Sequence, residues 1–429
     1  MIDIKLIREN SELVKENIKK KFQNDKLQLV DEIIGKDCEW RKLKYEADNL
    51  RKERNIVSEG INQAKKSKDN KKAEQLIKKA KEIPEEISKL EEKEEKLQEE
   101  IIKMLIQIPN MMSSKVVKGK DATENIEIKK WGKLPKFDFP IKNHVELAEE
   151  LGIANFEKSA EVTGKGFYYL KNELAILNQA LIRFTIDFMR EKNWEYIETP
   201  LMLNKKSIFA SMDKTAIEQS VYSIKDDDLY LIGTAEQSLL AMHSGDIIQE
   251  EKLPKKYFSY SMCFRKEIGA HGINEKGLWR THQFNKVEQF AFCKPEDSEK
   301  IYNEMMKNTE EIIEALELPY RIIDLCSGDM ADWKYKSADF EVYRATTKKY
   351  DEIMSLSNCT DYQARKLDIK CIDKHGNRRV LHTLNDTAIA TSRIMVALLE
   401  NNQQKDGSIK IPKALWKYTG FKKIKEKKK

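Results

Sequence analysis

The chain has 429 residues, and its 78 lysines and arginines against 72 aspartates and glutamates give a formal net charge of +6. A chain of this length is expected to form two or three domains, and a hydrophobic content of 40% argues against general disorder. The charged fraction is 35%, and no apolar run approaches the roughly 18 residues of a membrane span. The N-terminal residues contain no apolar signal segment. We therefore expect a soluble cytoplasmic protein without membrane contact.

The six cysteines are scattered along the sequence. No two of them form a CxxC pair, and none lies at metal-ligand spacing from a histidine. Scattered cysteines of this kind are typical of reduced thiols in an intracellular protein. The sequence therefore predicts no zinc site.

Residues 1–112 carry a helical pattern that differs from the rest of the chain. Apolar residues recur in steps of three and four along 40–64 and again along 73–108, and a single charged residue interrupts each series. Such seams are typical of coiled-coil helices. The segment 65–72 between them has no apolar residue, which predicts a tight turn. The two helices are therefore expected to form an antiparallel hairpin over about residues 39–108.

The charges of this predicted hairpin are segregated. Residues 41–82 contain 14 Lys/Arg against 7 Asp/Glu, a net charge of +7, whereas residues 85–100 contain 3 Lys against 8 Glu, a net charge of −5. Two interpretations remain open: a solvated coiled-coil surface, or a basic tip that binds a phosphate backbone. The lysines of the tip are Lys65, Lys66, Lys68, Lys71 and Lys72. Pro84 is expected to kink the second helix or to mark its start.

A boundary near residue 112 separates this arm from a second domain over 113–429, which ends in a lysine-rich tail. The stretch 109–142 has three prolines and weak periodicity, and is expected to be a linker. Helical patterns follow at 143–151 and 173–192. Strand-like runs occur at 257–265, 280–293, 321–325, 350–355 and 379–384. Consecutive strands between helices predict an α+β domain with a mainly antiparallel sheet and flanking helices.

The most informative segment is a pair of strand-like runs, 256–267 and 280–292, joined by the loop 268–279. Strand alternation places two arginines, a phenylalanine and two carboxylates on one surface. These residues are Arg265, Glu267, Arg280, Phe284 and Glu288. Guanidinium groups match phosphate and carboxylate oxygens, a ring can cover a base, and a carboxylate can hold an ammonium group. This surface is therefore suited to a nucleotide together with an amino acid.

In order along the chain, these segments resemble the motifs of class II aminoacyl-tRNA synthetases, and specifically the seryl-tRNA synthetase family. Pro200 in YIETPLM corresponds to the proline that ends motif 1 at the family's dimer interface. Residues 264–267 and 280–284 correspond to motif 2, and HTLNDTAIATSR with Arg393 corresponds to motif 3. Residues 234–236 are the family's TAE element. The resemblance extends over almost the whole chain, the helical arm included.

The resemblance implies a serine–tRNA ligase. Such an enzyme joins L-serine to ATP as seryl-adenylate, releases pyrophosphate, and transfers the seryl group to the 3′ end of tRNA(Ser); tRNA(Sec) is an open second acceptor. It also implies a homodimer and an arm that binds the tRNA. The implied catalytic residues are Arg265 and Arg393. The implied serine-binding residues are Thr234, Ala235, Glu236, Arg265, Glu288, Asn385 and Thr387. The implied ATP-binding residues are Arg265, Lys266, Glu267, Arg280, Phe284, Glu352, Ile353, Met354, Ser355 and Arg393.

The family's magnesium element corresponds to Glu352 and Ser355, whose oxygens suit a hard cation that accompanies ATP. Simple strand alternation would place these two side chains on opposite faces. The strand is therefore expected to bulge or to end between them. One departure from the family pattern is Asp386, which stands where many relatives have glycine. Asp386 is expected to lie beside the pocket, where it would bear on the geometry of the serine hydroxyl.

Two other functions are compatible with parts of this pattern. One is a related enzyme that loads a small amino acid onto a carrier protein, which the presence of the arm disfavours. The other is an RNA-binding scaffold with an inactive synthetase domain. The second alternative is disfavoured because the implied site residues are all present together.

Overall fold

The computed structural model describes residues 1–268 and 276–426. It divides into two compact units, one formed by Ile2–Pro109 and the other by Asn110–Lys429 together with Met1. In the part that the structure describes, no helix is long and apolar enough to cross a membrane. All six cysteines lie in this part and are free thiols.

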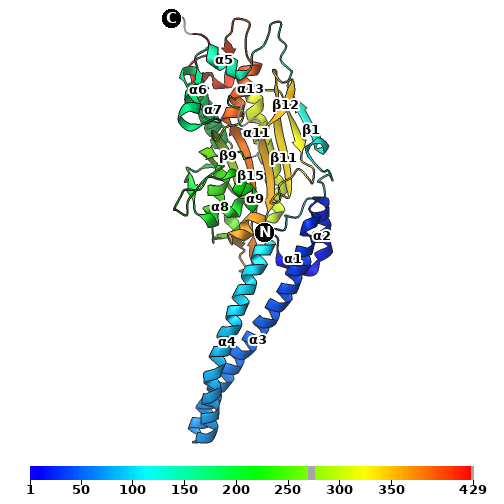
Figure 1. Cartoon of the computed structure of the whole chain (residues 1–429), viewed down its shortest axis with the longest axis vertical. Coiled ribbons are helices and arrows are strands. Elements are labelled where there is room, and N and C mark those ends of the chain that lie inside the picture. The colour runs from blue at the N-terminus through cyan, green and yellow to red at the C-terminus, as the bar shows by residue number, and fades with distance from the viewer. Residues whose placement is uncertain (269–275, 427–429) are drawn as a thin grey trace. The chain divides into compact units, whose positions relative to one another are not determined.

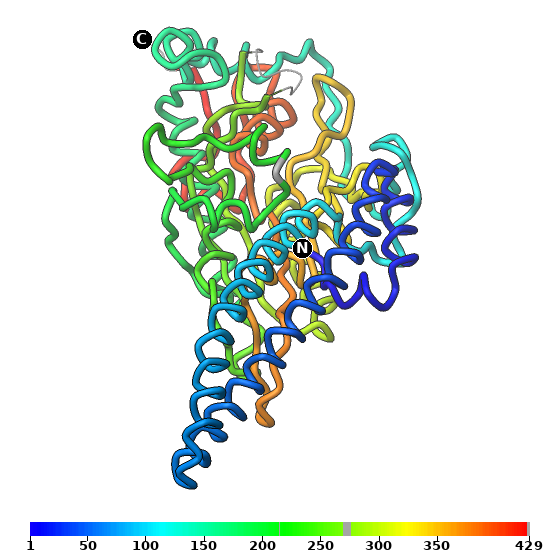
Figure 2. Tube along the Cα trace, turned by 60° about the horizontal axis from the view of Figure 1, so that its bottom comes forward, coloured from blue at the N-terminus to red at the C-terminus, as the bar shows by residue number. Residues whose placement is uncertain are grey.

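The N-terminal unit consists of helices. They are α1 (Ile4–Glu9), α2 (Ser11–Lys20), α3 (Leu27–Lys66) and α4 (Asn70–Leu105). Helices α3 and α4 lie side by side along the hairpin (Figures 1 and 2). The predicted seam packs between them, with Val57, Ile83 and Ile87 buried at its centre. The predicted coiled-coil hairpin is therefore confirmed.

The ends of these helices differ in detail from the sequence prediction. The first arm begins at Leu27 rather than near residue 39, because Val30 and Ile33 are buried where α3 contacts α1 and α2. The turn is only three residues long, and the Asp69 side chain caps α4 by accepting from the backbone N–H of Lys72 at 3.1 Å. Pro84 lies inside an uninterrupted α4, so its interpretation as a helix start is wrong.

The second unit is built on an eight-stranded sheet in the order β1-β10-β11-β12-β15-β9-β8-β4 (Figure 1). Its strands are β1 (Ile126–Trp131), β4 (Glu195–Tyr196), β8 (Lys255–Phe264), β9 (Gln283–Cys293), β10 (Tyr320–Asp324), β11 (Lys336–Arg344), β12 (Lys349–Thr360) and β15 (His382–Ala390). Every neighbouring pair is antiparallel except β4 with β8. The predicted α+β class with a mainly antiparallel sheet is confirmed.

Smaller sheets and helices complete this unit. The short strands are β2 (Ala154–Asn155), β3 (Tyr169–Leu170), β5 (Met202–Leu203), β6 (Tyr230–Leu231), β7 (Ile247–Gln249), β13 (Lys370–Ile372), β14 (Arg378–Val380), β16 (Ile409–Lys410) and β17 (Lys423–Ile424). The helices are α5 (His144–Glu150), α6 (Phe156–Thr163), α7 (Asn172–Glu191), α8 (Lys205–Ser211), α9 (Lys214–Ser220), α10 (Ala235–Ala241), α11 (Ser298–Ala315), α12 (Tyr362–Lys366), α13 (Thr391–Asn401) and α14 (Trp416–Thr419).

Three sequence predictions for this unit are corrected by the structure. The stretch 109–142 is not only a linker, because β1 within it pairs with β10 at the edge of the sheet. The run 280–293 becomes a strand only at Gln283, and the run 379–384 is divided between β14 and β15. Most of the loop predicted at 268–279 lies outside the described residues.

Candidate active site

The central strands β8, β9 and β15 present polar side chains on one face of the sheet. Register pairs Glu288 with Thr387 and with Ser259, and alternation brings Lys286 and Phe284 of β9 to the same face. The opposite face is covered by α11. There the Thr309 hydroxyl donates to Asp386 Oδ2 at 2.7 Å, and Gln289 Nε2 donates to the same oxygen at 3.0 Å. The predicted effect of Asp386 on the pocket is therefore wrong, because its side chain faces α11.

A buried group of charged and polar side chains joins the start of α10 to this face. The Thr234 hydroxyl caps α10 and accepts from Lys286 Nζ at 3.0 Å. Lys286 also forms an ion pair with Glu288. Asn385 Nδ2 donates to Glu236 Oε1 at 3.1 Å. The structure thus brings together the side chains of four predicted serine-binding residues, Thr234, Glu236, Glu288 and Asn385, and Thr387 is paired beside Glu288. Ala235 is buried at the first turn of α10.

Burial shifts the ionisation of both glutamates in this group. It raises the pKa of Glu236 to about 7, and the charge of Glu288 adds to the rise. Burial also raises the pKa of Glu288, against the lowering effect of Lys286. Carboxylates held in a low dielectric with incomplete compensation attract a cationic ligand strongly. This buried polar group has the chemistry to bind a small ligand with an ammonium group.

Arg265 follows the last residue of β8 and lies between two parts of the site. Its Nε donates to the carbonyl oxygen of Gly233, next to Thr234, at 3.1 Å. Its guanidinium carbon lies 5.2 Å from the centre of the Phe284 ring. Between the end of β8 and the start of β9, Arg280 Nη1 donates to Glu267 Oε2 at 3.3 Å. Motif 2 therefore brings the Arg265 guanidinium group next to this buried polar group and against the Phe284 ring, and it contains a second arginine paired with a carboxylate.

Strand β12 contains a bulge, one of the two alternatives that the sequence left open. Glu352 pairs with Glu341 and Ser355 pairs with Asp339, so Ile353 is an extra residue between them. Since positions 339 and 341 share a face, Glu352 and Ser355 do so as well. Arg393 of α13 donates from Nη1 to the Glu352 carbonyl oxygen at 2.7 Å. Ile353 and Met354 are buried in the core, so only their backbone is available to a ligand.

The donors at this position fit a hard cation. The Glu352 side chain is half exposed, and Ser355 Oγ accepts from Lys334 Nζ at 3.2 Å. Beside them, Asp339 Oδ1 is buried without a hydrogen-bond partner. These oxygens suit Mg²⁺, which keeps part of its shell for phosphate and water. No group of three or more His, Cys, Asp or Glu ligands gathers in residues 1–268 and 276–426, and the absence of zinc stays a prediction.

Several residues at the site lie outside the sequence predictions. Strand alternation puts Lys286 on the same face as Glu288, two positions away, but the sequence assigns it no role. Gln363 donates to Glu236 at 2.7 Å, and the Trp279 ring lies 5.5 Å from the Arg393 guanidinium carbon. No sequence pattern indicates either of these. Among the predicted residues, Lys266 directs its ammonium group toward the Tyr222 ring, 6.0 Å from its centre.

The antiparallel sheet, the arginine after β8, the flanking ring and the arginine at the start of α13 together define a class II aminoacyl-tRNA synthetase. Residues 220–402 match the tRNA synthetase class II core domain (G, H, P, S and T), and residues 1–112 match the seryl-tRNA synthetase N-terminal domain. The chain belongs to the seryl-tRNA synthetase family, and its activity is that of a serine–tRNA ligase.

Individual relatives are similar to this chain over almost their whole length. The chain is 43% identical to a serine–tRNA ligase of Methanocella arvoryzae, over 97% of this chain and 98% of that protein. The seryl-tRNA synthetase of Pyrococcus horikoshii, solved with ATP, superposes with a TM-score of 0.93 at 41% identity and covers all of both chains. The cytoplasmic serine–tRNA ligase of Naegleria fowleri, solved with AMP, has a TM-score of 0.88 at 30% identity, over 100% of this chain and 99% of that one.

The buried ion pair makes a prediction about stability. Lys286→Met leaves Glu288 without its cation inside the protein, and should lower the free energy of unfolding by about 3–5 kcal/mol. Lys286→Met combined with Glu288→Met removes both charges and should recover much of that loss. Urea unfolding of the three proteins measures this difference. Equal losses in the single and double variants would contradict a strong pairing of the two charges.

Proposed function

We propose that this site joins L-serine to ATP by attack of the serine carboxylate on the α-phosphate, and then passes the seryl group to the 3′ end of tRNA(Ser). The observation that carries this proposal is the position of Arg265. It bridges the pocket for a cationic ligand at Gly233–Thr234 and the ring of Phe284. A guanidinium group there can bind the serine carboxylate and the α-phosphate together.

The remaining residues receive roles from the same geometry. Glu236 and Glu288 hold the serine ammonium group, and Thr387 with Asn385 lies beside them for the hydroxyl. Phe284 stacks on the adenine, and Glu267 accepts from its amino group. Arg280 and Arg393 hold the β- and γ-phosphates. Glu352 and Ser355 hold the Mg²⁺ that accompanies ATP, which neutralises phosphate charge when bound.

This chemistry requires no general base among the side chains. A serine carboxylate, with a pKa of roughly 3.5, is already ionised at neutral pH. The enzyme therefore works by positioning the carboxylate in line with the α-phosphate and by compensating the charge on the phosphate oxygens. Arg265 and Arg393 are the residues placed to do so.

The proposal extends to assembly and location. Pro200 is exposed, and its carbonyl oxygen accepts from Ser238 Oγ at 2.7 Å, so motif 1 is tied to α10 while its outer side stays accessible. We propose that this surface forms a homodimer and that the enzyme acts in the cytoplasm. The arm binds tRNA(Ser), and tRNA(Sec) is the second acceptor to test.

Pyrophosphate exchange tests the proposed reaction. With serine, and not with threonine, alanine or glycine, the protein should exchange labelled pyrophosphate into ATP without tRNA. Arg265→Ala should abolish this exchange, whereas Arg378→Ala, at an exposed arginine of β14, should leave it unchanged. Exchange with alanine or glycine would favour the carrier-protein ligase, and no exchange by the folded protein would favour the RNA-binding scaffold.

The pKa of Glu236 makes serine binding depend on pH. With a pKa of about 7, this carboxyl group is neutral below pH 7 and loses its attraction for an ammonium group. The KM for serine should therefore rise as the pH falls from 8 to 6, by up to about tenfold per pH unit. Glu236→Gln should raise the KM at pH 8 about 10- to 100-fold, the loss of a charged hydrogen bond, and should remove the pH dependence.

Stability provides the control for this variant. Because the folded-state pKa of Glu236 is raised, its contribution to stability is present at low pH and is lost as the pH rises through 7. The glutamine Oε1 can accept from both Gln363 and Asn385, as the glutamate does. Glu236→Gln should thus be at least as stable as the native protein at pH 8. Lower stability together with an unchanged KM would contradict the assigned role.

The arm makes a separate prediction. The five tip lysines are exposed and surround the turn between α3 and α4. Replacing all five with glutamine should spare serine-dependent exchange, but should raise the KM for tRNA about 10- to 100-fold at low salt and flatten its salt dependence. The control replaces the three lysines on the acidic part of α4, Lys89, Lys93 and Lys96, with glutamine. Unchanged tRNA charging in the tip variant would exclude these lysines from the interface.

A further inference from the structure

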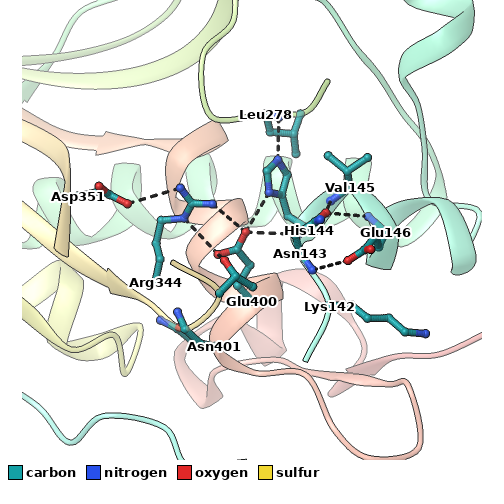
Figure 3. Close-up of polar contacts among 12 residues, drawn as sticks. Lys142, Asn143, His144, Val145, Glu146, Leu278, Arg344, Asp351, Glu400 and Asn401 are labelled. Atoms are coloured by element: carbon teal, nitrogen blue, oxygen red, sulfur yellow. Dashed lines mark hydrogen bonds and ion pairs between the residues drawn. The ribbon is translucent and has the colours of Figure 1, made fainter. Parts of the chain in front are cut away.

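His144, the first residue of α5, lies buried outside the residues assigned to substrates. Figure 3 shows its ring between the end of the motif 2 loop and α13. Its Nε2 accepts from the backbone N–H of Leu278 at 3.2 Å, and its Nδ1 lies 3.0 Å from Glu400 Oε1. The loop approaches the ring so closely that a Cβ at Gly277 would lie 2.3 Å from Nε2.

These contacts determine the tautomer of the imidazole. A backbone N–H can only donate, so Nε2 must carry the free lone pair. Nδ1 then holds the proton and donates it to Glu400. Burial alone would raise the pKa of Glu400, but hydrogen bonds from His144, Arg344 and Thr346 and the charge of Arg344 lower it to about 2. Glu400 is thus an ionised acceptor that orients the ring.

The same carboxylate connects the loop to the sheet. Arg344 of β11 donates to the two Glu400 oxygens at 2.9 and 3.1 Å, and to Asp351 Oδ2 of β12 at 3.4 Å (Figure 3). Its guanidinium carbon also lies 4.4 Å from the centre of the Trp279 ring. The Arg393 guanidinium contacts the same ring. Leu278 and Trp279 are therefore held between α5, β11 and α13, immediately before Arg280.

We propose that His144 is a positioning residue for ATP. Its Nε2 holds the Leu278 amide, and thereby fixes Trp279 and Arg280 in the place from which Arg280 and Arg393 bind the phosphates. The contribution passes through the loop backbone, and His144 itself touches no substrate. The proposal rests on the phosphate-binding roles given above to Arg280 and Arg393.

Two substitutions each remove one of the two hydrogen bonds that the imidazole ring forms. In His144→Asn, the side-chain amide replaces Nδ1 and can still donate to Glu400, but nothing reaches Leu278. In His144→Gln, the amide oxygen replaces Nε2 and can still accept from Leu278. The side-chain hydrogen bond to Glu400 is lost, and only the backbone N–H of residue 144, 3.3 Å from Glu400 Oε1, still donates to this carboxylate. His375→Ala, at an exposed histidine between β13 and β14, is the control.

The expected result is a division between ATP binding and stability. In serine-dependent pyrophosphate exchange, His144→Asn should raise the KM for ATP about five- to tenfold, the range of one hydrogen bond, with kcat and the KM for serine within about twofold. His144→Gln should keep the KM for ATP within about twofold and should lose thermal stability instead. Equal effects of both variants on the KM for ATP, or no effect of either, would overturn the proposal.

A readout that does not depend on activity completes the test. Hydrogen–deuterium exchange of a peptide that begins at Lys276 and contains the Leu278 amide should be faster in His144→Asn than in the native protein and His144→Gln. Unchanged exchange in His144→Asn would also overturn the proposal. Should that variant fail to fold, Gly277→Ala probes the same contact from the loop and should raise the KM for ATP. If the native protein shows no serine-dependent pyrophosphate exchange, the proposed function fails. Hydrogen–deuterium exchange at the Leu278 amide still tests the contact with His144 in that case.

Discussion

The register of β9 between β8 and β15 is the constraint on which the site depends. It places Glu288 opposite both Ser259 and Thr387, with Lys286 two positions away on the same face. A slip of one residue would turn these side chains toward α11 and bring Gln289 into the pocket. The register is held from behind, where Asp386 and Gln289 bond to Thr309 and Asn308 of α11. Asp386, which the sequence predicts to lie beside the serine site, thus helps to align the strands that form this site.

Glu236 and Glu400 are both buried, but their pKa values shift in opposite directions because their hydrogen-bond partners differ. Burial raises the pKa of both Glu236 and Glu400. Glu400 receives hydrogen bonds from a guanidinium group, an imidazole and a hydroxyl group, and its pKa falls to about 2. Among the described residues, Glu236 accepts from the neutral amides of Gln363 and Asn385, so burial and the like charge of Glu288 raise its pKa to about 7. Glu400 is fully compensated and acts as a structural anchor, whereas Glu236 still lacks a cation and can accept one from a ligand.

The sequence predicts what is local or periodic, and fails where contacts are distant. The heptad seam around Val57 and Ile83, and the common face of Arg265 and Phe284, follow from spacing alone. The strand-like runs of the sequence do not include β11, although Ala338, Phe340 and Val342 alternate and are all buried. They do not include β1 either, because an edge strand buries little of its surface. The contacts of His144 with Leu278 and Glu400 span 134 and 256 positions, and no periodicity carries such a pairing. The orientation of Asp386 likewise required knowledge of which face α11 covers.

Strand β12 shows how one extra residue can serve the core and the site together. In a regular strand, two side chains on the same face are separated by a single residue that faces the other side. Between Glu352 and Ser355 there are two residues, Ile353 and Met354. With Ile353 inserted opposite β11, the two polar side chains share a face while Ile353 and Met354 both enter the core. The Glu352 carbonyl oxygen, next to the bulge, accepts from Arg393 Nη1 at 2.7 Å. The arginine that is proposed to bind the phosphates is thus held by the residue that precedes the bulge.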